Sequence, residues 1–213
     1  MLGRIQQRLL DLYDLDQTSS VDDFVCDEEA ARAAVGDDGV ARREVLLVAH
    51  EPDGIAIGLY VDDEAVQALS TTAGDAWLDE TRFDACCLAT EGVSHFVYFV
   101  FRAENDHSVT QLELELQAEI DKYATALLAG NGVGLIHARS RWLRRKLFEN
   151  VEFLDEAESE AGERYRLANR LASQYAARLE SRYVVRGDLD ALARELRRFY
   201  RLGAREKIET AGG

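Results

Sequence analysis

Residues 44–61 have the sequence EVLLVAHEPDGIAIGLYV, which predicts a β-hairpin. Two mostly apolar runs, 44–50 and 55–61, flank a short turn over 51–54. In this turn Pro52 restricts φ and Gly54 tolerates a positive φ, which are the properties that a tight turn requires. Both runs contain enough apolar residues to predict strands that are covered on both faces.

The next strongly apolar run predicts a third strand over about residues 95–102, where the sequence is HFVYFVFR. A stretch this short fits a buried strand and falls well below the ~20 residues that a helix needs to cross a membrane. The segment before it, 82–93, has a pattern that is ambiguous between helix and strand. The predicted sheet is therefore small and antiparallel, and consists of the hairpin and this strand.

Helical spacing of apolar residues accounts for most of the remaining chain. It predicts helices over 1–14, 27–35, 62–71, 108–130, 135–154, 156–184 and 188–208. The helix from 108 has Ser108 as its predicted N-cap, since Gln111 follows three residues later. The predicted fold class is α+β, with the small antiparallel sheet packed with helices and a C-terminal half that is mostly α-helical. We expect an acidic α+β domain over 1–134 and a helical C-terminal subdomain over 135–213 packed on it, or alternatively one single domain.

The net charge of −15 is distributed unevenly along the chain. Residues 1–107 contain 23 acidic and 7 basic residues, whereas residues 108–213 contain 17 and 18. The acidic half disfavours nucleic acids and anionic membranes as partners, because it repels polyanions. The chain has three cysteines without CxxC spacing and no recognisable secretion signal, so we predict a cytoplasmic protein without disulfides.

Four residues are weak candidates for metal-assisted catalysis: Glu91, His95, Glu115 and Glu119. On a helix, Glu91 and His95 would lie one turn apart on one face, and an imidazole with carboxylates can bind a metal ion. The pattern departs, however, from the His-Glu-x-x-His and Glu-x-x-His motifs of known metal sites. We therefore prefer a structural interpretation, in which His95 opens the third strand and the glutamates form a solvated helix face. No metal ligand and no cofactor is predicted.

The most distinctive basic segment is 139–146, RSRWLRRK, in a strongly acidic protein. Arginine beside an aromatic ring can bind phosphate or stack on a base. The candidate binding residues of this segment are Arg139, Arg141, Trp142, Arg144 and Arg145. A second basic face is predicted further on, with Arg194, Arg198 and Arg201 at helical spacing. The preferred interpretation of segment 139–146 is that it pairs with acidic groups of the protein itself.

No catalytic motif is present, and the long amphipathic helices could present a face to a partner. The sequence therefore predicts an intracellular accessory, adaptor or regulatory protein that acts by binding a macromolecule, with another protein as the expected partner. Two alternatives stay open: a metal-assisted hydrolase-type enzyme that uses His95 and nearby carboxylates, and a nucleotide or RNA binder that uses segment 139–146. Convergence of His95 with these carboxylates in one cleft would favour the enzyme, whereas an exposed arginine-lined groove would favour a binding protein.

Overall fold

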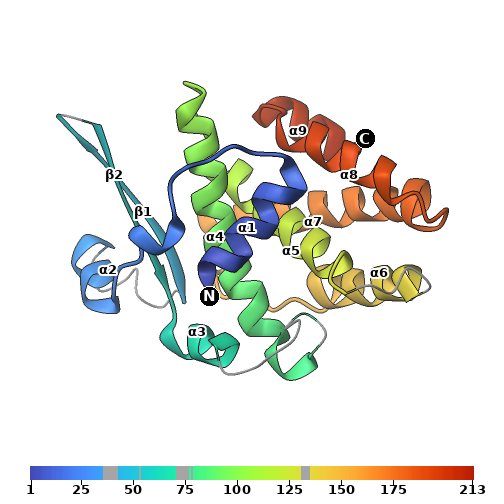
Figure 1. The fold of residues 1–213 in the computed structure, drawn as a ribbon, viewed down its shortest axis with the longest axis horizontal. Coiled ribbons are helices and arrows are strands. Elements are labelled where there is room, and N and C mark those ends of the chain that lie inside the picture. Colours follow the sequence, from blue (N-terminus) through green and yellow to red (C-terminus); the bar gives the residue numbers. More distant parts are fainter. Residues whose placement is uncertain (36–42, 53, 71–76, 78, 131–134) are drawn as a thin grey trace.

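The computed structural model of the protein describes residues 1–35, 43–52, 54–70, 77, 79–130 and 135–213. Within these residues the chain forms one antiparallel hairpin and nine α-helices (Figure 1). The strands are β1 (Glu44–Glu51) and β2 (Gly54–Val61). The helices are α1 (Leu2–Tyr13), α2 (Glu28–Val35), α3 (Asp63–Ser70), α4 (Phe83–Glu104), α5 (Gln111–Leu127), α6 (Ile136–Arg144), α7 (Glu160–Leu179), α8 (Leu189–Tyr200) and α9 (Ala204–Gly212). The predicted α+β class and the mostly helical C-terminal half are confirmed.

Two long helices, α4 and α5, pack against each other at the centre of the fold. α3 and the hairpin contact α4, α1 crosses it, and α7 packs against α5. α8 and α9 lie on the side away from the hairpin (Figure 1), where α8 contacts α1 and α9 contacts α7. Phe96, Leu116, Tyr175 and Phe199 all belong to one continuous hydrophobic core, although they come from both predicted domains. The division of the chain at residue 134 stays a prediction.

The hairpin is buried only at its base. Its strands pair from Glu44 opposite Val61 to Glu51 opposite Gly54. Near the base Leu59 and Val61 are buried, whereas toward the turn Val48 is 41% and Ile55 is 45% exposed. Figure 1 shows the turn end projecting away from the helices. The prediction that both strands are covered on both faces is therefore wrong for this end of the hairpin.

The predicted strand over 95–102 is wrong, because these residues lie within the long helix α4. The apolar run is buried on several sides at once, since α1, α5 and the hairpin all pack around this helix. A helix that is buried all round loses its amphipathic pattern, so a short apolar run fits a strand and a helix equally well. The helical conformation places His95 one turn after Glu91 on the same face of α4.

The start of one predicted helix and the continuity of another also differ from the prediction. The N-cap of α5 is Thr110 rather than Ser108: its hydroxyl accepts a hydrogen bond from the backbone amide of Glu113, and the Glu113 carboxylate accepts one from the Thr110 amide. The helix predicted over 188–208 is divided into α8 and α9, with a break at 201–203. This break turns α9 back onto α7.

The described part of the chain contains no helix that is long and apolar enough to cross a membrane. Among the described residues, Cys26, Cys86 and Cys87 form no disulfide. Burial raises the pKa of the Cys87 thiol, and a thiol that stays protonated is a poor nucleophile. Cys86 is buried beside it in the hydrophobic core, which agrees with a structural role for this pair.

Candidate metal centre

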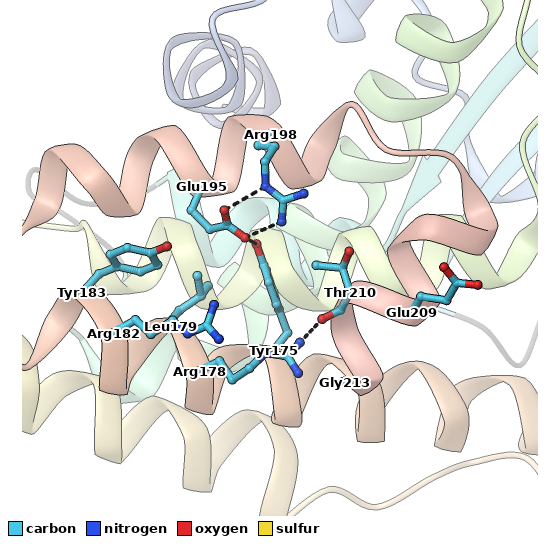
Figure 2. A pocket seen from close by; sticks show the side chains of 10 residues that line it. All are labelled: Tyr175, Arg178, Leu179, Arg182, Tyr183, Glu195, Arg198, Glu209, Thr210 and Gly213. Carbon is cyan, nitrogen blue, oxygen red and sulfur yellow. Dashed lines mark hydrogen bonds and ion pairs between the residues drawn. The ribbon is translucent and has the colours of Figure 1, made fainter.

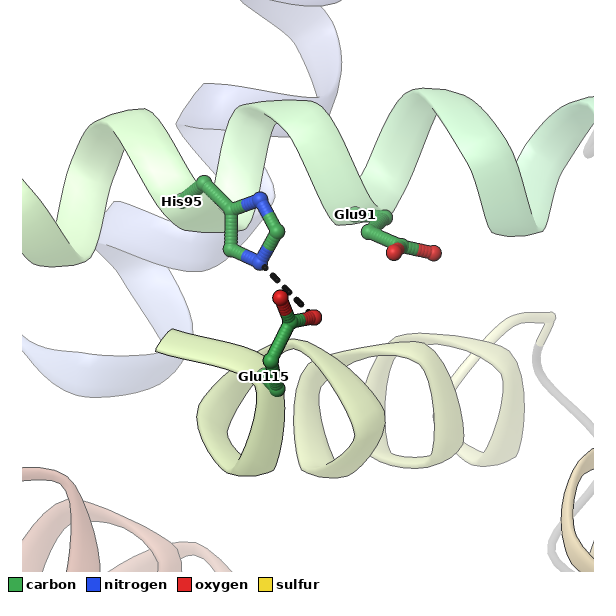
Figure 3. Close-up of side chains that lie close together, drawn as sticks. All are labelled: Glu91, His95 and Glu115. Atoms are coloured by element: carbon green, nitrogen blue, oxygen red, sulfur yellow. Dashed lines mark ion pairs between the residues drawn. The ribbon is translucent and has the colours of Figure 1, made fainter. Parts of the chain in front are cut away.

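A cluster of ionisable side chains lies between α4 and α5, next to the first residue of β1. α4 contributes Glu91 and His95, and α5 contributes Glu115 and Glu119, each pair being four residues apart and so on one helix face. Figure 3 shows Glu91 and His95 extending from α4 toward Glu115 on α5. The structure thus brings together the four candidates that the sequence identifies, within one helix–helix interface.

Three of these residues converge closely enough to bind a single ion. One ligand atom from each of Glu91, His95 and Glu115 lies within 4.8 Å of the other two. His95 is 6% and Glu115 is 8% exposed, so both are withdrawn from bulk water. An imidazole nitrogen and two carboxylate oxygens in this arrangement suit a divalent transition metal such as zinc, iron or manganese.

A further carboxylate, that of Glu44, orients the imidazole of His95. Its Oε1 lies 3.3 Å from His95 Nδ1, so the ring can donate its Nδ1 proton to Glu44. The other nitrogen, Nε2, then faces Glu115 at 3.6 Å, which is too far for a hydrogen bond, and it has no other hydrogen-bond partner among the described residues. When the ring is protonated, Nε2 and Glu115 form an ion pair (Figure 3). Loss of the Nε2 proton would leave Nδ1 held by Glu44 and Nε2 free to bind a metal, which is the arrangement found around protein-bound metals.

Gly92 allows the hairpin to approach α4 closely enough for this contact. A Cβ atom at residue 92 would lie 2.9 Å from Glu44 Cγ, 3.0 Å from Val61 Cγ2 and 3.2 Å from Leu59 Cδ1. These distances are shorter than ordinary carbon–carbon contacts, which are about 3.5–4.0 Å. Any larger residue at this position would therefore displace the hairpin, and with it the carboxylate that holds the His95 ring.

Lys122 connects the remaining carboxylates of the cluster. Its Nζ lies 3.1 Å from Glu91 Oε2 and 2.8 Å from Glu119 Oε1, and it donates a hydrogen bond to each. The Lys122 side chain is itself buried. Burial alone would lower the pKa of Lys122, but Glu119 and Glu91 more than compensate and hold it well above the ordinary value. Lys122 is therefore a permanent cation of the cluster.

Negative charge exceeds positive charge in this cluster even when both basic groups are protonated. Burial opposes the charged form of His95, yet Glu44 and Glu115 raise its pKa well above the usual range. Burial also raises the pKa of Glu44 and of Glu119. These crowded acids therefore tend to take up protons. When all four are ionised, they outnumber the two basic groups in a largely desolvated space, and this arrangement favours a further cation, either a proton or a metal ion.

The structure contradicts the solvated helix face that the sequence analysis prefers for these glutamates. Glu115 is buried, and Glu119 is inaccessible enough that one of its carboxylate oxygens is buried without a hydrogen-bond partner among the described residues. Glu119 and Lys122 form an ion pair at 2.8 Å within α5. Glu44 and Lys122 are the members of the cluster that were not among the candidates from the sequence. The local signal for Glu44 is a carboxylate at the start of an apolar strand.

Comparison with protein-family models, with curated proteins and with solved structures finds no match to this chain. The function of the protein must therefore be argued from the geometry of its own side chains.

The arginines of segment 139–146 divide between the interior and the surface. Arg139 donates hydrogen bonds to the backbone carbonyls of Leu127 and Ala129, and Arg144 forms an ion pair with Glu180 at 3.3 Å. The ring of Trp142 packs edge-on against Phe83. The residues of this segment that are exposed are Arg141, Arg145 and Lys146. Arg144 therefore pairs with an acidic group of the protein as predicted, with Glu180 as the partner, whereas Arg139 binds backbone carbonyls instead.

Two arginines of the second basic face also form contacts within the protein. Arg198 pairs with Glu195 at 2.8 Å on the same helix. Arg201 donates to the carbonyls of Tyr13 and Asp14 at 2.9 and 3.1 Å, which satisfies the C-terminal end of α1. Arg194 is exposed. The candidates on α8 thus include one residue that docks α1 and one that pairs within its own helix.

A small cavity of about 130 Å³ lies between α7, α8 and α9 (Figure 2). It is lined by Tyr175, Arg178, Leu179, Arg182, Tyr183, Glu195, Arg198, Glu209, Thr210 and Gly213. Most of its polar groups are already engaged, since Glu195 binds both Arg198 and the Tyr175 hydroxyl, and Arg178 donates to the Thr210 carbonyl. This cavity is therefore a weaker candidate for a ligand site than the cluster between α4 and α5, because most of its polar groups already bond one another.

A second buried polar network surrounds Asp121 on α5. Its carboxylate accepts hydrogen bonds from Ser94 Oγ at 2.6 Å, from Gln117 Nε2 at 2.7 Å and from the hydroxyl of Tyr13. Gln117 Oε1 accepts a further hydrogen bond from Lys207 Nζ. All five side chains are buried, so the network ties α1, α4, α5 and α9 together through the core.

Replacing Lys207 with methionine should change how stability depends on pH. Burial lowers the pKa of Lys207 to about 7, although Asp121 and Glu113 oppose this effect; in an unfolded chain lysine titrates at about 10.4. Because the folded protein binds fewer protons between these values, Lys207 contributes stability that is complete above the unfolded pKa and is lost as the pH falls through about 7. From pH 7 to 9 the wild-type free energy of unfolding should rise by on the order of 2 kcal/mol relative to the variant.

Urea unfolding of both proteins at pH 7, 8 and 9, followed by circular dichroism, measures this difference. Lys146→Met is the matched control, because Lys146 is exposed and its replacement should leave the pH dependence unchanged. Parallel pH profiles for the wild type and Lys207→Met would show that the buried ammonium is not the group responsible.

Proposed function

We propose that the protein binds one divalent transition-metal ion through Glu91, His95 and Glu115, and that this ion activates water in a hydrolase-type reaction. The observation that carries the proposal is the buried Nε2 of His95, whose contact with the Glu115 carboxylate is a long ion pair at 3.6 Å and which makes no hydrogen bond among the described residues. A buried polar atom without a partner costs free energy unless a ligand binds it. The surplus of carboxylates around this nitrogen favours a cation as the ligand.

Three protein ligands leave at least one coordination position for water, as they do in catalytic zinc sites. A zinc ion held in this way would lower the pKa of its bound water to about 7, far below that of bulk water, and would so supply hydroxide near neutral pH. The side chain of Glu91 is 24% exposed, which gives water a route to the cluster. Glu44 would hold the His95 ring and Lys122 would hold Glu91, so that both ligands are positioned in advance.

Metal binding can be counted directly after the purified protein has been treated with a chelator. Equilibrium dialysis against Zn²⁺, Co²⁺ and Mn²⁺ should give close to one ion per chain for at least one of them. Saturation at 100 times the dissociation constant should stabilise the folded protein by about 2.7 kcal/mol, and EDTA should reverse this. Glu104→Ala removes an exposed carboxylate from the same helix and should leave the count unchanged.

Failure of all three ions to bind at millimolar concentration would show that the cluster is only an internal ion-pair network. Hydrolysis of 4-nitrophenyl esters and phosphodiesters tests the reaction class separately. Turnover should require the added ion and disappear with EDTA. Metal binding without any turnover would retain the metal site and remove the hydrolase assignment.

A second proposal, independent of the metal, is that the protein binds an acidic protein segment along α6 in a reducing, cytoplasmic environment. It is supported by the exposure of Arg141, Arg145 and Lys146 and by three cysteines that form no disulfide among the described residues. Replacing these three residues with glutamine should weaken binding to poly-glutamate, measured by fluorescence anisotropy, without lowering stability, because exposed charges contribute little to folding. Equal binding by the triple variant would contradict this proposal. Single-stranded RNA is the comparison ligand; binding at physiological salt that is lost in the variant would identify a nucleic acid as the partner instead.

A further inference from the structure

The ammonium of Lys122 lies beside the three proposed ligands and shares one of them. Glu91 contributes a ligand atom to the group formed with His95 and Glu115, and its Oε2 also lies 3.1 Å from Lys122 Nζ. On the other side of Nζ, Glu119 Oε1 is 2.8 Å away. The Glu91 carboxylate thus stands between two cation positions, one facing His95 and the other filled by Lys122.

We propose that Lys122 fills the second cation position of a two-cation carboxylate site and thereby limits the site to one metal ion. The inference rests on the proposed function, because it presupposes an ion at Glu91, His95 and Glu115. In two-metal sites the ions lie about 3.5–4 Å apart and share carboxylate ligands between them. Here Glu91 is the shared carboxylate, and the ammonium takes the place of the second ion.

The groups around Lys122 are those that a second ion would require. Glu119 has a second oxygen, Oε2, that is buried and has no hydrogen-bond partner among the described residues. Without the ammonium, Glu91 and Glu119 would be two partly desolvated carboxylates with no cation between them, which costs free energy. A divalent ion from solution could restore the balance with the same two carboxylates, at the position that Nζ vacates.

A simple internal ion pair would behave differently when the lysine is removed. If Lys122 only satisfies Glu91 and Glu119, its removal should weaken the fold or leave those carboxylates protonated, and the number of bound metal ions should stay at one. If it occupies a cation position, its removal should open that position to a second ion. The number of ions bound per chain therefore separates the two interpretations.

The test is metal stoichiometry in Lys122→Met, measured by equilibrium dialysis against Mn²⁺ and Zn²⁺ and elemental analysis of the dialysed protein. We expect one ion per chain in the wild type and two in the variant. The matched control Lys146→Met, at an exposed position, should stay at one. One ion in both the wild type and Lys122→Met would overturn the inference while leaving the proposed metal site intact, whereas no ion in the wild type would overturn the proposed function itself.

Circular dichroism establishes first that the variant is folded. If Lys122→Met does not fold, the same count is made on Lys122→Gln, whose amide can still donate hydrogen bonds to a neighbouring carboxylate. The expected count for Lys122→Gln is again two, because the glutamine carries no charge and an ion can displace its short side chain. A count of one for this folded variant would overturn the inference in the same way.

Discussion

His95→Ala should weaken the binding of Co²⁺ or Zn²⁺ by at least about 100-fold. The substitution removes the one nitrogen ligand of the proposed site and leaves only carboxylates, which bind these ions less tightly than a mixed set of ligands. Loss of a residue that merely orients a ligand typically costs 10- to 100-fold in metal affinity, so loss of the ligand itself should cost at least the larger value. Titration of the cobalt absorption bands measures the affinity of both proteins.

Two further variants locate the effect within the cluster. Glu44→Gln retains His95 but weakens the contact to Nδ1, so its affinity should fall by roughly 10- to 100-fold. His137→Ala removes an exposed imidazole and should leave the affinity unchanged. Should His95→Ala disturb the fold, His95→Gln preserves most of the side-chain volume and serves for the same titration. Unchanged affinity in a folded His95 variant would exclude His95 as a ligand.

Asp121→Ala should lower the free energy of unfolding by about 3–5 kcal/mol, the range expected when one partner of a buried charged network is removed. The hydroxyls of Tyr13 and Ser94 and the amide of Gln117 all donate to this carboxylate. After the substitution these donors are left in the core without an acceptor, and a buried unsatisfied group costs about 1–3 kcal/mol. The buried Lys207 also loses Asp121, the carboxylate on α5 that does most to favour its charged form.

Urea denaturation followed by circular dichroism measures this loss of stability. Asp16→Ala, at an exposed carboxylate in the segment after α1, should change the free energy of unfolding by less than about 0.5 kcal/mol. The loss of stability in Asp121→Asn should lie between those in Asp121→Ala and Asp16→Ala. The asparagine carbonyl oxygen can still accept hydrogen bonds, but its NH₂ group faces other donors. A loss below about 1 kcal/mol for Asp121→Ala would mean that water replaces the carboxylate, and that the network does not hold the four helices together.

The candidate site shows how far local spacing can predict a functional cluster. Glu91 and His95 are four residues apart, and so are Glu115 and Glu119. This spacing predicts that the two side chains of each pair lie on one face of their helix. It does not predict that these two faces meet. The erroneous prediction of a strand over 95–102 argued against a cluster, because a strand would have separated His95 from a helix carrying Glu91.

The sequence alone did not predict the contacts between residues that are far apart in the chain. Glu44 lies 51 residues from His95, and Tyr13 lies 108 residues from Asp121. From the local sequence, each of these residues is indistinguishable from an ordinary polar residue of a strand or helix. Their burial, and therefore their chemistry, depends on which helices pack together.

The sequence by itself determined the β-hairpin at residues 44–61 and most of the helices, because turn chemistry and helical periodicity are local properties. For metal binding it offered only weak candidates, and it favoured a structural role for them. The tertiary structure decided that the apolar run 96–101 is helical, since a segment surrounded by α1, α5 and the hairpin gains the same burial in either conformation and shows no periodicity that distinguishes them. It also decided that Glu44, His95 and Lys122 share one desolvated space. That outcome follows from the packing of α4 against α5 and from the close approach that Gly92 permits, neither of which is encoded in any short stretch of the chain.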